Sequence, residues 1–72
     1  MTKEELNMKV GSNIKRYRKL KGITQQELAN KIEVATPLIG ALESSKMNQG
    51  LSIYTLYNIS KVLNVNINKF FE

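Results

Sequence analysis

The residues that most often carry out chemistry in enzymes are missing from this sequence. It has no histidine and no cysteine, and all six of its acidic residues are glutamates. Zinc sites are built chiefly from cysteine and histidine, and histidine is the commonest general base and a member of most nucleophilic triads. We therefore predict a protein that is not an enzyme and that needs no metal or other cofactor.

Basic side chains offer the most evident binding chemistry. Eleven lysines and arginines outnumber the six glutamates, which gives a net charge of +5. This surplus favours a polyanionic partner, although a basic surface can also serve solubility alone. The apolar runs are far shorter than the roughly 20 residues of a membrane span, and the N-terminus has no signal-peptide pattern. We expect a cytoplasmic protein with no membrane partner and no small-molecule ligand.

The first element that must position these side chains is a long N-terminal helix. Thr2 and Glu5 have the spacing of a capping box, and apolar residues then recur at helical spacing as far as Tyr17. Gly22 is suited to the left-handed conformation that ends a helix near Lys21. A glycine at position 11 weakens the helix before it, so residues 1–9 could be a frayed extension of a single domain that spans 1–72.

Two short helices and a further longer one should follow. Thr24 and Glu27 form a second capping box, and a tight connection over 33–35 leads to a third helix. We expect Thr36 to be the N-cap of this helix and Pro37 its first residue. After a polar loop over 44–51, a fourth helix begins at the cap Ser52 and ends at a left-handed Asn64, and a final turn begins at Asn66.

The most informative stretch is 24–45, which contains two short helices separated by a few residues. Two helices that cross steeply need a small residue where they touch, and Ala29 provides one in the middle of the first helix. Val34 in the turn, with Ile39 and Leu42 beyond it, can fill the angle between them. This combination of a capping box with four spaced apolar positions predicts a helix-turn-helix.

From this point the sequence resembles the Cro and phage-repressor type of helix-turn-helix domain, the XRE family. The resemblance covers residues 10–71 and rests on GSNIKRYRK at 11–19, GITQQELA at 22–29, Ile39, Leu42-Glu43 and ISKVLNV at 59–65. It implies an all-α, compact five-helix, lambda-repressor-like domain. In that family the third helix, here about 36–45, enters the DNA major groove, usually as a two-fold dimer on a palindromic operator.

The resemblance also implies roles for individual residues. Gln25, at the start of the second helix, matches a residue that binds a DNA phosphate with help from the helix dipole. Arg18 and Glu43 match a structural ion pair between the first and third helices. The positions expected to face the groove and contact bases are Thr36, Pro37, Leu38 and Ala41. Further phosphate contacts are expected from Ser44, Lys46 and Asn48, although a solvated loop is an alternative, and Leu38 could instead pack within the protein.

Two departures from the family pattern concern the turn geometry and the reading surface. Glu33 occupies the turn position that usually holds glycine, where a left-handed conformation would cost about 1 kcal/mol. Gly40 and Ala41 stand where relatives often carry polar residues. Base discrimination would then rest on Thr36 and on apolar contacts with thymine methyl groups, a weaker code than bidentate hydrogen bonding.

The C-terminal residues suggest a homodimer. Phe70 and Phe71 are adjacent, so their side chains point about 100° apart on a helical turn and one ring should remain at the surface. Phe70 matches a core position, which leaves Phe71 with Val65 and Ile67 as the expected dimer interface. The alternative is that both rings close the core of the monomer.

Together these observations predict a sequence-specific transcriptional regulator of double-stranded DNA, acting as a repressor. The alternative that stays open is a protein-interaction module or antirepressor that keeps the fold without reading DNA, because the third helix is so apolar. The steep salt dependence of phosphate contacts would separate the two.

Overall fold

Helices make up most of the structure, a computed structural model that describes residues 1–44 and 51–72. The four α-helices of these residues are α1 (Lys3–Lys21), α2 (Gln25–Lys31), α3 (Thr36–Glu43) and α4 (Ile53–Leu63), and a 3-10 helix, η1, spans Ile67–Phe71. The described residues include no strand. The all-α fold is as predicted, with the expected fifth helix being a 3-10 helix.

The helix ends follow the local signals in the sequence. The Thr2 hydroxyl accepts from the main-chain N–H of Glu5 at 3.1 Å, and Thr24 accepts from Glu27 at 3.0 Å, each with the reciprocal bond from the cap N–H to the glutamate. The hydrogen bond from the main-chain N–H of the cap threonine lowers the pKa of Glu5 and of Glu27, and the threonine side chain lowers it further by a smaller amount. Both predicted capping boxes are therefore formed.

The ends of α1 and α4 also lie where they were predicted. Gly22 ends α1 with a φ of 79°, and Asn64 ends α4 with a φ of 56°. Ser52 caps α4 by accepting from the N–H of Thr55 at 3.1 Å. α1 runs from Lys3 through the buried Gly11 as one helix. The fraying of residues 1–9 stays a prediction.

The start of α3 differs from the prediction by one residue. Ala35 is the N-cap, with extended backbone and no side-chain bond, while Thr36 is already helical and Pro37 is the second helical residue. The N–H of Leu38 instead donates to the carbonyl oxygen of Ala35 at 3.0 Å. The first four N–H groups of a helix have no partner within it, so proline fits either position and cannot fix the boundary.

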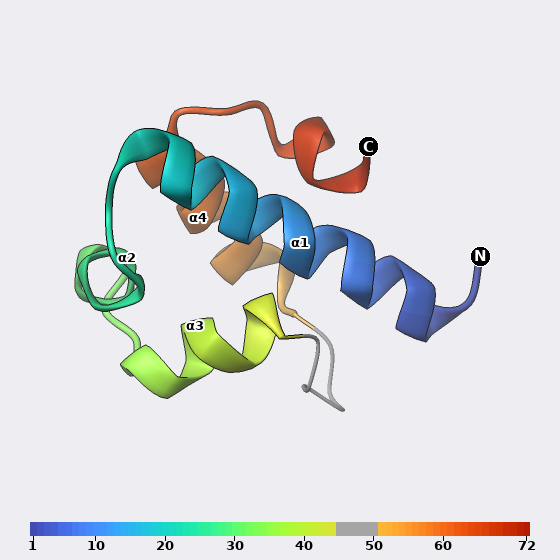
Figure 1. Cartoon of the computed structure of the whole chain (residues 1–72), viewed down its shortest axis with the longest axis horizontal. Helices are drawn as coiled ribbons and strands as arrows, with labels where there is room; N and C mark the ends of the chain where they lie inside the picture. Colours follow the sequence, from blue (N-terminus) through green and yellow to red (C-terminus); the bar gives the residue numbers. More distant parts are fainter. Residues whose placement is uncertain (45–50) are drawn as a thin grey trace.

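One core joins all five elements, and α1 lies at its centre (Figure 1). In this view α1 crosses in front of α4, α3 lies below α1, and η1 lies above α1. The buried apolar residues are Val10, Ile14, Leu28, Ala29, Ile39, Leu42, Leu56, Ile59, Leu63 and Phe70. Because α2 packs on α4, α3 packs on α1, and the two helices pack on each other, the core fixes their mutual angle.

Candidate nucleic-acid interface

The junction between α2 and α3 is closed by small and left-handed residues. Ala29 and Ile39 are fully buried where the helices meet, and the N–H of Val34 donates to the carbonyl oxygen of Ala29 at 3.0 Å. Glu33 has a φ of 59° although it is not a glycine. The turn thus keeps its left-handed geometry despite the substitution that the sequence showed, and the predicted helix-turn-helix is present.

The outer face of α3 is partly open to solvent. Pro37 is exposed, and Thr36 and Ala41 are half-buried. No hydrogen bond to the Thr36 hydroxyl is formed within the described residues, and it plays no part in capping α3. Leu38 is half-buried and packs against the core, so much of its side chain is occupied inside the protein. Leu38 therefore has less of its side chain free to contact bases than the exposed Pro37.

Arg18 and Glu43 form a bidentate ion pair. Arg18 donates from Nε to Oε2 of Glu43 at 2.6 Å and from Nη2 to Oε1 at 3.0 Å. The side chains are only 9% and 2% exposed. Arg18 also donates from Nη1 to the carbonyl oxygen of Ile23 at 2.8 Å, which fixes the turn before α2. This arginine holds α1, the α1–α2 turn and the end of α3 together.

Gln25 joins the same cluster. It is the first residue of α2, and its Nε2 donates to Oε1 of Glu43 at 3.1 Å. Its Oε1 lies 3.7 Å from the place where a Cβ at Gly40 would stand, so the carboxamide rests on the backbone of α3. No sequence pattern predicted this contact, because Gln25 and Glu43 are 18 positions apart.

The loop after α3 carries the remaining predicted phosphate contacts. Ser44 is exposed at the C-cap of α3, and its hydroxyl donates to the carbonyl oxygen of Ala41 at 3.3 Å. Lys46 and Asn48, the other two residues expected to bind phosphate, lie outside the described residues.

The two C-terminal aromatic rings part as the sequence predicted. Phe70 is fully buried and meets the ring of Tyr17 edge-on, with 6.1 Å between centroids, whereas Phe71 is 46% exposed. Val65 and Ile67, the other residues expected at a dimer interface, are half-buried against the core. Phe71 therefore offers the most exposed apolar surface among the three.

Two features were missed from the sequence. Asn13 is buried in α1, where its side chain bonds the main chain of Phe70; its place among the core positions of α1 was a signal that could have identified it. The second is an apolar face on α4 formed by Ile53, Tyr54 and Tyr57, of which Ile53 is 82% exposed. The Lys61 ammonium group lies over the Tyr57 ring, 5.6 Å from the ring centroid.

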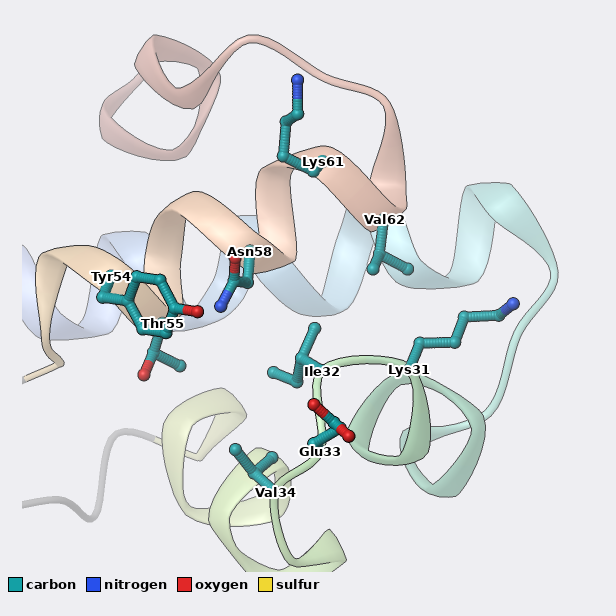
Figure 2. A pocket seen from close by; sticks show the side chains of 9 residues that line it. All are labelled: Lys31, Ile32, Glu33, Val34, Tyr54, Thr55, Asn58, Lys61 and Val62. Carbon is teal, nitrogen blue, oxygen red and sulfur yellow. The ribbon is translucent and has the colours of Figure 1, made fainter.

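An open pocket lies between the α2–α3 turn and α4. Figure 2 shows Ile32, Glu33 and Val34 on one side and Tyr54 and Asn58 on the other. None of the residues predicted to bind DNA lines this pocket.

In the described part of the chain, no three potential metal ligands lie together, and no helix has both the length and the apolar character needed to cross a bilayer.

Comparison with known proteins adds independent observations. A family model described as helix-turn-helix matches residues 14–70. The chain is 37% identical to a mutant of the restriction-modification controller protein C.Esp1396I, covering 93% of this chain and 87% of that one, with a TM-score of 0.81. No curated protein matches it.

Two further solved structures are similar. SinR of Bacillus subtilis, a master regulator for biofilm formation solved in complex with DNA, is 35% identical over 88% of this chain and 98% of that one, with a TM-score of 0.80. The controller protein C.AhdI from Aeromonas hydrophila shares the fold at a TM-score of 0.82 and 22% identity, covering 90% of this chain and 96% of that one.

Proposed function

The chain belongs to the XRE-type helix-turn-helix family, and on that premise we propose that it is a transcription regulator that binds specific sites in double-stranded DNA and represses by occupying them. The observation that carries the proposal is the 35% identity with SinR over 88% of this chain, because SinR was solved in complex with DNA. The net charge of +5 supports a polyanionic partner.

In the proposed complex α3 enters the major groove. Support comes from the open outer face of α3, where the Thr36 hydroxyl has no partner among the described residues and Pro37 is exposed. Thr36 can hydrogen-bond a base edge, and Ala41 and Pro37 can contact thymine methyl groups. Phosphate contacts from Gln25, Ser44, Lys46 and Asn48 would set the register of α3 on the duplex.

We further propose that residues 1–72 act as one domain that pairs with a second copy. Phe71, with smaller contributions from Val65 and Ile67, would form the two-fold interface. Such a dimer would present two α3 helices about one helical turn of DNA apart, roughly 34 Å, to a palindromic operator. Regulation of this kind takes place on the chromosome, so we place the protein in the cytoplasm.

A salt titration of binding to duplex DNA tests the proposal. We expect log affinity to fall steeply with log salt, and Lys46→Ala to reduce the slope by about one. Lys61→Ala is the control. This substitution removes the same charge from α4, where the lysine lies over the Tyr57 ring. Absence of duplex binding would favour the protein-interaction module that the apolar surface of α3 suggests.

A further inference from the structure

The carboxylate of Glu43 accepts hydrogen bonds from two different helices. Its Oε2 accepts from Nε of Arg18, and its Oε1 accepts both from Nη2 of Arg18 at 3.0 Å and from Nε2 of Gln25 at 3.1 Å. The Glu43 side chain is 2% exposed. One buried carboxylate therefore connects the ion pair, which lies inside the protein, to a side chain at the proposed DNA surface.

Chemistry dictates how the Gln25 carboxamide is turned. An ionised carboxylate can only accept, so Gln25 must present its nitrogen to Glu43 and direct its oxygen elsewhere. That oxygen lies over Gly40, where the absent side chain leaves the α3 backbone uncovered. The amide nitrogen carries two hydrogens, and Glu43 takes one of them. The second hydrogen remains available as a donor.

We propose that Glu43 and Arg18 are positioning residues for DNA binding, which hold the Gln25 carboxamide with its second N–H available to a DNA phosphate. This inference rests on the proposed function. Holding the side chain in one rotamer before binding removes part of the entropy cost of forming the phosphate contact. A Cβ at Gly40 would stand 3.7 Å from the Gln25 Oε1, an ordinary contact distance, so only a side chain longer than that of alanine would compete with the carboxamide for its place on α3.

Arg18 has a second part in this arrangement. A bare carboxylate beside a phosphate-binding side chain would repel the phosphate, and the repulsion would be stronger near buried surfaces than in water. The bidentate guanidinium cancels that charge at 2.6 and 3.0 Å. Removing Arg18 therefore exposes DNA to an uncompensated Glu43, whereas removing both charges does not.

The test measures duplex affinity of purified full-length variants at a temperature where each is folded. Gln25→Ala and Glu43→Ala should each weaken binding about three- to tenfold, and the double variant should lose no more than the larger single loss. Arg18→Ala should bind more weakly than Arg18→Ala/Glu43→Gln, because the glutamine removes the uncompensated charge. Ser52→Ala, which removes the N-cap hydrogen bond of α4, serves as the destabilised control with unchanged affinity.

A second measurement does not depend on DNA. In the free protein, the side-chain NH2 hydrogens of Gln25 should exchange with water more slowly than those of the exposed Gln26. Glu43→Gln should keep part of this difference in exchange rate. Gly40→Met should abolish the difference, because the methionine side chain takes the place of the carboxamide on α3. Additive losses in the Gln25 and Glu43 pair, or failure of Glu43→Gln to improve Arg18→Ala, would overturn the inference while leaving DNA binding intact. A wild-type chain that binds no duplex would overturn the proposed function itself.

Discussion

Asn13 in α1 donates a hydrogen bond of 2.9 Å from its Nδ2 to the main-chain carbonyl oxygen of Phe70, 57 positions further along the chain. Both residues are buried, and the Phe70 ring packs against Tyr17 on the same helix. This bond and the ring contact fasten η1 to α1. The short C-terminal helix is thereby held in a defined place, with Phe71 on its outer side.

Asn13→Ala should destabilise the fold by about 1–3 kcal/mol, because it leaves the buried carbonyl of Phe70 without a donor. Urea unfolding followed by circular dichroism measures the loss. Ser12→Ala, at the exposed neighbouring position, is the matched control and should change stability little. Equal effects of the two variants would show that water replaces the amide at no cost.

Glu43→Ala should cost about 3 kcal/mol of folding free energy, because it leaves the buried Arg18 guanidinium without its charged partner. Adding Arg18→Ala should then cost little more, and thermal unfolding of the four species of this cycle gives the coupling. The exposed pair of Lys69 and Glu72, 3.6 Å apart, is the control, since Lys69→Ala should change stability by less than about 1 kcal/mol. Purely additive losses at Arg18 and Glu43 would contradict a buried pair.

Glu33→Gly should stabilise the protein by about 0.5 to 1 kcal/mol. The left-handed backbone at Glu33 is strained for a residue with a Cβ, and the relief exceeds the entropy that glycine adds to the unfolded chain. Asn64→Gly makes the same change at the other left-handed position, where asparagine is already tolerated, and should gain almost nothing. Chemical denaturation of both variants compares the two, and a loss at position 33 would mean that the Glu33 side chain makes a favourable contribution.

Thr36→Val should alter the preferred base at one operator position and leave stability nearly unchanged, because the hydroxyl does not cap α3. Selection of bound sites from a random duplex pool provides the measurement. Ser52→Ala is the opposite case: it removes the cap of α4 and should cost about 1 kcal/mol without changing base preference. A uniform affinity loss across all sequences for Thr36→Val would remove Thr36 from the reading surface.

Phe71→Ser should yield a helical monomer in sedimentation experiments and weaken operator binding. The ring is 46% exposed and can be removed without opening the core. Ile53→Ser tests the competing apolar face on α4, which is more exposed still. If Ile53→Ser dissociates the dimer and Phe71→Ser does not, the interface lies on α4.

Local signals in the sequence were sufficient to locate most helix ends. The capping boxes at Thr2 and Thr24, and the left-handed Gly22 and Asn64, each involve atoms only a few residues apart, so their geometry is encoded locally. The predicted start of α3 was wrong by one residue. Ala35 accepts through its main-chain carbonyl oxygen, which every residue type has, so the sequence does not identify it as the cap.

Contacts between distant segments were harder to predict. Arg18 and Glu43 were paired only through the family resemblance, and no pattern of spacing joined them. The contact of Gln25 with Glu43 and that of Asn13 with Phe70 were not predicted at all, because each depends on how whole helices cross. Polar residues can serve many partners, so their residue type does not identify which partner the fold brings near.

The shortness of α2 and α3 has a consequence for how this surface is lost. They contain seven and eight residues, well below the roughly 12 to 15 at which an isolated helix begins to persist in water. Packing in the shared core, where Leu28 and Ile39 are buried, and the pair of Arg18 with Glu43 keep them helical. The surface that we assign to DNA therefore disappears together with the core in one cooperative transition. Heat or proteolysis would then lower the number of competent molecules rather than the affinity of each one.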